Sequence, residues 1–452
     1  MVETKMIINF DPTSKDAESY FVYFQKKTFL IIESSTNTRT SIKKSIAQLG
    51  VKSANIIDAV NIKMAKDIIE KQRPHFVLAP KSINNESSLE LLDLHISHLP
   101  DRLNAGFFIT TNENSLAEVA LALEYEMDGL ISTPFTASTI INTIATAVHP
   151  KISPKDFQLR NNEGRLQLIK GNQEKAKEHF QTSLKISAKN FEAYFYLGMI
   201  AKNENDPVEA VKFFELSYLQ NPKHYRTLIE LSNIYLQLKQ YKKAYEINLD
   251  LVKHFPIAPS RIPDLIKLSI ANQKYDDLNN YFRIFDQLNN QSPELKIAIA
   301  AGFAVVGRYY LQNKNFEHSQ KALKLSFINS DGKYEILDNI YKCYVEMNLG
   351  EAFLNLFDEV NLDEWPQVAQ IFYCLGMHIG TNEDYKVINL GEKLLRKGLH
   401  NPHLYKAVIE RGININRKLG IIEAQVLEAS SKFPDLKHEI EKLFEIAKSK
   451  LT

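Results

Sequence analysis

Two different spacings of apolar residues divide the chain near residue 150. Before that point, short runs of consecutive apolar residues alternate with segments whose apolar positions recur every three or four residues. Runs of the first kind predict buried strands, and segments of the second kind predict helices. The predicted strands are 28–32, 55–58, 75–79, 106–110 and 129–132. Five strands alternating with helices predict an α/β fold with a doubly wound, five-stranded parallel sheet, which binds ligands at the carboxyl ends of its strands.

After about residue 155 only the helical spacing remains, and it continues to the C-terminus. Residues of similar type recur there at 34-residue steps. The recurring positions are Gly164, Gly198 and Ser232; Ala176, Ala210 and Ala244; and, at the unit ends, Ala188, Pro222 and Pro256. Small residues let two antiparallel helices approach closely, and proline ends the second helix. The period predicts an all-α superhelical solenoid of helical hairpins, whose core forms only when neighbouring hairpins stack.

The repeat weakens after about residue 257. Gly307 restarts the phase after an insertion, and three further degenerate units follow it. We expect about eight hairpins in all. An irregular helical bundle after residue 260 is the alternative. The predicted organisation is an N-terminal extension (1–26), an α/β domain (27–150) and a helical array (155–452).

Composition narrows the function classes. The net charge is +1 and charged residues make up 24% of the chain, so bulk charge does not indicate a nucleic-acid partner. The two cysteines, Cys343 and Cys374, belong to no CxxC or Cys/His cluster, so we expect two buried apolar side chains and no metal site. No leader-like N-terminus and no long apolar run is present, so we expect a cytoplasmic protein without membrane insertion.

One repeat unit carries a recognisable set of residues: Tyr194, Leu197, Gly198, Ala210, Phe214 and Pro222. In this pattern the array resembles the tetratricopeptide repeat family, most strongly over residues 156–257. The resemblance implies a concave, partner-binding face lined by the first helix of each hairpin. The positions that it assigns to that face are Asn161, Arg165, Phe195, Met199, Arg226, Ile229 and Asn233. The family's two-lysine, one-asparagine clamp for a C-terminal carboxylate is absent, which disfavours binding of chaperone tails.

The α/β domain resembles a response-regulator receiver, a flavodoxin-like fold. The segments that carry the resemblance are FLIIESSTNTR at 29–39, HFVLAPKSINNESSLELL at 75–92 and TTNENSLAEVALALEYEMDGLISTPFTASTI at 110–140. The TPF followed by TASTI is the most specific part, because receivers usually have Lys-Pro-Phe there.

The resemblance also implies a phosphorylation pocket, and most of its chemistry is missing. The acidic pair that would hold Mg²⁺ is Glu33 and Ser34, so one carboxylate is lost. Pro80 stands at the nucleophile position, and no Asp or Glu occurs between His75 and Asn85 to replace it. Thr133 stands at the lysine position, and only Thr111 keeps the hydroxyl. We interpret the domain as a pseudo-receiver. The alternative interpretation is that the receiver fold serves only as a solubilising cap.

These observations predict a non-enzymatic, bacterial-type signalling adaptor without a cofactor, in which phosphorylation plays no part. The pseudo-receiver would dock a partner through its fourth helix, fifth strand and fifth helix, and the array would hold a second protein, such as a signalling or motility component. The alternative is a ligand sensor that binds a nucleotide or second messenger near Glu33, Ser34, Thr111 and Thr133. His75, His95 and His98 give only a weak metal signal, and the sequence leaves homo-oligomerisation open.

Overall fold

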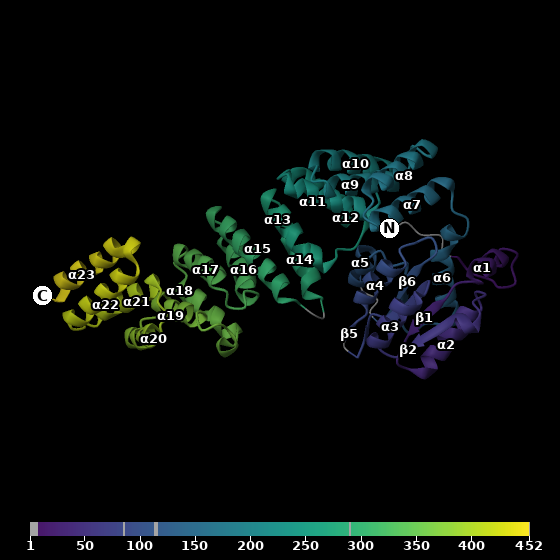
Figure 1. Ribbon diagram of the computed structural model, residues 1–452. Coiled ribbons are helices and arrows are strands. Elements are labelled where there is room, and N and C mark those ends of the chain that lie inside the picture. Colours follow the sequence, from purple (N-terminus) through teal and green to yellow (C-terminus); the bar gives the residue numbers. More distant parts are fainter. Residues whose placement is uncertain (1–7, 85, 113–115, 289–290, 452) are drawn as a thin grey trace. The chain divides into compact units, whose positions relative to one another are not determined.

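The computed structural model describes residues 8–84, 86–112, 116–288 and 291–451 (Figure 1). It divides into two compact units, Met1–Ala258 and Pro259–Thr452. The sheet domain and the first three hairpins therefore belong to one unit, although the pattern of strands and helices changes near residue 150. Residues 1–7 of the predicted extension and residues 113–115 of the predicted receiver segment lie outside the described residues.

The first unit begins with a five-stranded sheet in the order β2-β1-β3-β6-β7. Every neighbouring pair is parallel, and Phe29 of β1 lies level with Ile56 of β2 and Phe76 of β3. The sheet confirms the predicted doubly wound α/β fold. Its strands are β1 (Phe29–Ile32), β2 (Ile56–Ala59), β3 (Phe76–Pro80), β6 (Gly106–Thr111) and β7 (Gly129–Ser132).

Alternate residues of each strand point to opposite faces, and helices bury both faces. Phe29 and Ile31 face one side with α1, α2 and α6, while Leu30 and Ile32 face the other side with α3 and α4. The helices of this domain are α1 (Ala17–Phe24), α2 (Thr36–Ala47), α3 (Ile62–Gln72), α4 (Leu89–His98), α5 (Leu116–Glu124) and α6 (Ala137–Ile152).

Two local features were not predicted from the sequence. Helix α1, inside the predicted extension, packs into the domain core through Tyr20 and Phe24, which are buried. A two-residue ladder between β4 (Ser82–Ile83) and β5 (Glu86–Ser87) forms an antiparallel hairpin directly after β3. Its strands are too short to give a periodic signal in the sequence.

Three hairpins complete the first unit. Their helices are α7 (Asp156–Ile169), α8 (Gln173–Ile186), α9 (Phe191–Asn203), α10 (Pro207–Gln220), α11 (Tyr225–Gln237) and α12 (Tyr241–His254). The recurring glycines bring the paired helices together as expected: a Cβ added to Gly164 would lie 2.7 Å from the Phe180 ring, and one added to Gly198 would lie 2.7 Å from Phe214. The aromatic ring of each second helix thus occupies the space left by the missing side chain.

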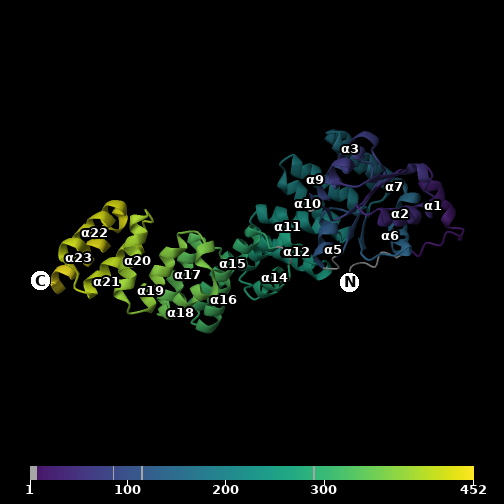
Figure 2. The same cartoon turned by 90° about the horizontal axis from the view of Figure 1, so that it is seen from below.

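The second unit continues the array with five more hairpins and a final helix, in the part of the chain that the structure describes. Figures 1 and 2 show its helices as consecutive neighbours from α13 to α23. The hairpins confirm the predicted helical solenoid over the irregular bundle. The helices are α13 (Ile262–Ala271), α14 (Asp277–Asp286), α15 (Pro293–Gln312), α16 (Phe316–Ile328), α17 (Tyr334–Glu346), α18 (Gly350–Leu354), α19 (Ala369–Gly380), α20 (Asp384–Arg396), α21 (Pro402–Asn414), α22 (Leu419–Lys432) and α23 (Lys437–Leu451).

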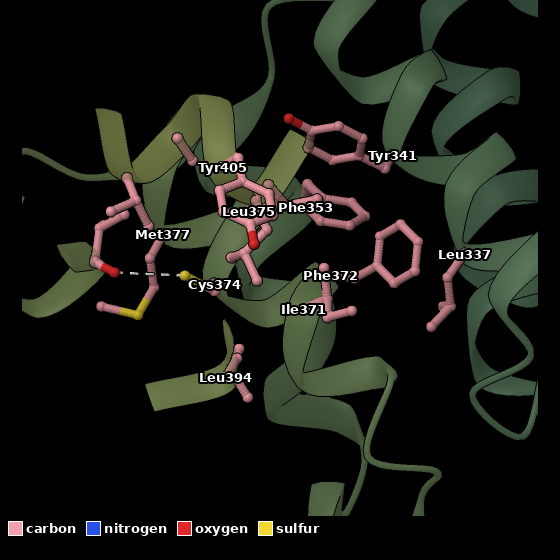
Figure 3. Close-up of a cluster of buried hydrophobic side chains, with 14 of the residues drawn as sticks. Leu337, Tyr341, Phe353, Ile371, Phe372, Cys374, Leu375, Met377, Leu394 and Tyr405 are labelled. Carbon is pink, nitrogen blue, oxygen red and sulfur yellow. Dashed lines mark hydrogen bonds between the residues drawn. The ribbon is translucent and has the colours of Figure 1, made fainter. Parts of the chain in front are cut away.

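A continuous apolar core runs from α15 to α23, and Figure 3 shows the part of it around Phe353, Phe372 and Tyr405. Cys374 lies in this core, where its thiol donates a hydrogen bond to the Val387 carbonyl at 3.6 Å. Cys343 is buried as well, and neither cysteine forms a disulfide. Burial raises the pKa of the Cys374 thiol to about 12, so it remains neutral. This confirms the prediction that both cysteines act as buried apolar side chains.

Candidate functional sites

The five predicted pocket positions gather at the carboxyl edge of the sheet. Glu33 and Ser34 follow β1, Pro80 ends β3, Thr111 ends β6 and Thr133 follows β7. Because β1, β3, β6 and β7 are consecutive in the sheet, these positions are neighbours along one edge. The Thr133 hydroxyl donates a hydrogen bond to the Thr111 carbonyl at 3.1 Å, and the Thr133 amide donates to the same oxygen at 2.7 Å. The loop after β7 is therefore tied to the end of β6.

The acidic groups at this edge already have partners. The Glu33 carboxylate accepts a hydrogen bond from the Ser35 amide at 2.8 Å, at the start of α2. The Arg39 guanidinium donates to the carbonyls of Glu33 and Ser34 at 2.6 and 2.9 Å. The Nε atom of Arg39 also lies 3.7 Å from the Oδ2 atom of Asp58. A cationic side chain of the protein thus lies beside the loop where receivers carry their acidic pair.

In the part of the chain that the structure describes, no cluster of three or more His, Cys, Asp or Glu side chains is arranged to hold a metal ion. The three histidines singled out from the sequence are separately engaged. His75 contacts the Thr28 hydroxyl at 3.0 Å through Nδ1, His95 reaches the Pro74 carbonyl at 2.8 Å through Nε2, and His98 contacts the Leu94 carbonyl at 3.0 Å.

A buried ion cluster that the sequence analysis missed lies at the opposite edge of the sheet. The Asp128 carboxylate, whose side chain is 9% exposed, pairs with Lys151 at 2.5 Å and with Arg102. It also accepts a hydrogen bond from the Phe107 amide at 2.8 Å. Burial opposes the charge on Asp128, but the two cations outweigh burial and hold the pKa of this carboxyl below its usual value. The cluster joins the end of α6 to the starts of β6 and β7.

The seven predicted concave positions of the array are all at least partly covered. Asn161 and Phe195 are buried, and Arg165, Met199, Arg226, Ile229 and Asn233 are half-buried. Asn161 exchanges side-chain amide hydrogen bonds with Asn190 at 3.0 and 3.1 Å. Phe195 lies under the Arg226 guanidinium, 4.6 Å from the ring centre. Asn161 and Phe195 therefore serve the contacts between hairpins, and their role as partner contacts remains a prediction.

Part of the cover, over α11, comes from the α5–β7 corner, which we define as residues 123–128. Leu123 packs against the cluster of Tyr225 and Leu228, where Ile229 also packs. Glu126 forms an ion pair with Arg226 at 2.8 Å. Burial opposes the charge on Arg165, but Tyr196, Glu126 and Glu192 outweigh burial and raise the pKa of this guanidinium. The corner thus supplies an apolar and an acidic group to α11, the first helix of the third hairpin.

A groove lies within the second unit. It has a volume of about 400 Å³ and lies between the first helices of two successive hairpins, α15 and α17, with one contribution from the loop before α14. Tyr275 stacks on Tyr309 at one end, with ring centres 4.1 Å apart. The residues that line the groove are Tyr275, Ala301, Ala304, Val305, Arg308, Tyr309, Gln312, Glu335, Ile336, Asn339 and Cys343.

The residues that line the groove include one cation and one anion, each on a different helix. Arg308 projects from α15 and Glu335 from α17, and both are exposed. Within the described ranges, neither the Arg308 guanidinium nor the Glu335 carboxylate forms an ion pair. The groove is also lined by the apolar side chains of Ala304 and Ile336. A sequence signal existed in the spacing of Ala301, Val305, Arg308 and Gln312 along one helix face, but the facing helix was needed to recognise a groove.

Comparisons with known proteins agree with the helical part of the fold. The tetratricopeptide repeat pattern matches residues 157–190. A curated relative, the BBSome complex member BBS4 homolog of Drosophila melanogaster, is 22% identical over 214 residues, which are 47% of this chain and 42% of that protein. The chain therefore matches less than half the length of this relative.

Two solved structures are similar to parts of the chain. A tetratricopeptide repeat protein from Parabacteroides merdae is similar to 64% of this chain and 98% of its own, with 13% identity and a TM-score of 0.31. A response regulator protein from Burkholderia pseudomallei with a phosphorylated aspartic acid is similar to 40% of this chain and 93% of its own, with 17% identity and a TM-score of 0.23.

Among the described helices, none has the length and apolar character needed to cross a membrane.

Proposed function

We propose that the chain is a non-catalytic signalling adaptor in which the receiver-like domain needs no phosphorylation and the repeat array binds a second protein. Tetratricopeptide repeats are protein-binding scaffolds, and the array supplies at least one open groove for that purpose. The proposed setting is the bacterial-type cytoplasm, with a signalling or motility protein as partner.

The proposed binding role rests on two charged side chains in the α15–α17 groove, Arg308 and Glu335, which form no ion pair within the described residues. Arg308 and Glu335 both line this groove, on different helices, together with the apolar side chains of Ala304 and Ile336. An extended segment with an acidic residue, an apolar residue and a basic residue would neutralise both charged groups and cover the apolar side chains. We therefore assign this groove to a peptide of that composition.

A positional-scanning peptide array probed with the full chain tests this assignment. We expect enrichment of peptides that place acidic and basic residues on either side of an apolar one. The affinity of a selected peptide should fall about tenfold in Arg308→Ala, in keeping with the loss of one charge-assisted contact. Lys321→Ala is the matched control, because Lys321 carries the same charge on α16 and pairs there with Glu317. Equal losses in the two variants would refute the assignment.

The receiver-like domain is tested separately, by incubating the chain with acetyl phosphate and Mg²⁺ and measuring its mass. Pro80 has no nucleophile, so we expect no phosphoryl adduct. Stoichiometric labelling at the carboxyl edge of the sheet would contradict a phosphorylation-independent domain. The alternative of a nucleotide or second-messenger sensor near Glu33 and Thr133 predicts a rise in melting temperature with such ligands.

A further inference from the structure

Two contacts join the α5–β7 corner to α11, the first helix of the third hairpin, and a third contact lies nearby. Leu123 inserts against Tyr225 and Leu228, and Glu126 pairs with Arg226 at 2.8 Å. Beside them, the Asn162 amide donates a hydrogen bond to the Asp101 carboxylate at 2.9 Å. The contacts combine an apolar anchor with a complementary charge pair, which is the combination that helical grooves use to hold protein ligands.

The groups engaged by the corner are groups that a partner would need. Arg226 stacks on Phe195 and directs its guanidinium to Glu126, and Ile229 belongs to the same apolar cluster as Leu123. A partner segment cannot pair with Arg226 or reach the cluster of Tyr225 and Leu228 from this side while Glu126 and Leu123 occupy them. The contact is also small and half-exposed, with the Glu126 side chain 41% exposed and the Arg226 side chain 29% exposed. Contacts of this size are reversible.

We propose that the groove of the first three hairpins is a protein-binding surface closed in cis by the α5–β7 corner. In the closed state this end of the array is unavailable, and a partner gains access only when the corner leaves. A segment with a leucine followed three residues later by an acidic residue, the pattern of Leu123 and Glu126, would compete for the same groups. The inference goes beyond the proposed function and does not depend on the α15–α17 groove.

The test measures how accessible the covered groove is in the full chain. Ile229→Cys places a thiol in the apolar cluster against which Leu123 packs, and its rate of reaction with a maleimide reports on opening. Adding Glu126→Arg sets two cations against each other, so we expect labelling about tenfold faster. Adding both Glu126→Arg and Arg226→Glu restores an ion pair of reversed polarity, so the rate should return toward the slow value.

The controls separate opening from general disturbance. Glu230→Lys makes a comparable charge reversal at the ion pair of Lys202 and Glu230, whose charged atoms are 2.6 Å apart. Both residues of this pair belong to the array, so the variant should leave the labelling rate unchanged. The chain without the introduced cysteine gives the background, because Cys343 and Cys374 are buried. If Ile229→Cys does not fold, Leu123→Cys reports from the other side of the contact. Fast labelling in the parent, or an equal rate with and without Glu126→Arg, would overturn the proposal.

Discussion

The Asn248 side chain donates a hydrogen bond of 2.5 Å to the Ser232 hydroxyl. In the two preceding hairpins, the position of Asn248 is occupied by phenylalanine and the position of Ser232 by glycine. In those hairpins Gly164 lies against Phe180 and Gly198 lies against Phe214. The third hairpin thus replaces a close apolar contact by a polar one at both positions together. Each pair closes the same gap between its helices, so the two partners must match in size and polarity.

A mismatched pair should be destabilising. In Gly198→Ser the new Cβ would lie 2.7 Å from the Phe214 ring, so we expect a loss of about 2 kcal/mol, typical of an overpacked core. The double variant Gly198→Ser/Phe214→Asn recreates the third hairpin's pair and should recover part of that loss. Denaturant unfolding of both variants measures the difference. Gly420→Ser is the control, since a Cβ at Gly420 would have no neighbour within 4 Å.

The buried guanidinium of Arg411 should be a major source of stability in the second unit. It donates hydrogen bonds to Asp384 at 2.7 Å, to the Thr381 carbonyl at 2.7 Å and to His378 Nδ1 at 3.1 Å. It thereby ties α21 to the end of α19 and the start of α20. Arg411→Met leaves these acceptors unsatisfied, so we expect a loss of about 3 kcal/mol in the free energy of unfolding.

The comparison for Arg411 is Arg396→Met. Arg396 forms an exposed pair with Glu392 at 3.2 Å, and its side chain is 80% exposed. Pairs of this kind contribute about 0.5 kcal/mol or less within a helix. Similar losses in the two variants would mean that the Arg411 network is only a surface feature.

The Asp128 ion cluster gives a matching prediction for the first unit. Asp128→Ala leaves Lys151 and Arg102 as buried cations without their carboxylate, at an expected cost of about 3–5 kcal/mol. Asp67→Ala removes a carboxylate from the exposed Lys71 pair on α3 and should cost under about 1 kcal/mol. Thermal unfolding followed by circular dichroism distinguishes the two outcomes.

Mild acid should weaken the first unit through a buried histidine. Burial lowers the pKa of His95 to about 4, below its unfolded value near 6.5. The unfolded state therefore binds the proton more readily, and the stability contributed by the neutral ring is lost as the pH falls from about 6.5 toward 4. Between pH 7 and 5 the loss is about 2 kcal/mol. His95→Gln removes this titration, so an unchanged pH dependence in that variant would contradict the assignment.

The sequence was sufficient for the features that depend on local spacing. Apolar runs such as 106–110 located the strands, and the 34-residue recurrence of Gly164 and Gly198 located the hairpins. The contacts that close the groove were not predictable, because Glu126 and Arg226 are 100 residues apart and neither belongs to a periodic pattern. The Asp128 cluster was missed for the same reason. An isolated charge in a sequence does not indicate whether it will be buried or which cation it will meet.

Helix α23 buries one side and exposes the other. It buries Ile440, Leu443 and Ala447 against the preceding hairpin, while its outer side pairs Lys437 with Glu441 and Lys448 with Glu445. A protein that packs on this side would have to displace water from these charges, and it would gain an apolar contact with the exposed Ile446. Whatever stacks on α23 therefore has to combine an apolar residue for Ile446 with charged residues that match the ion pairs beside it.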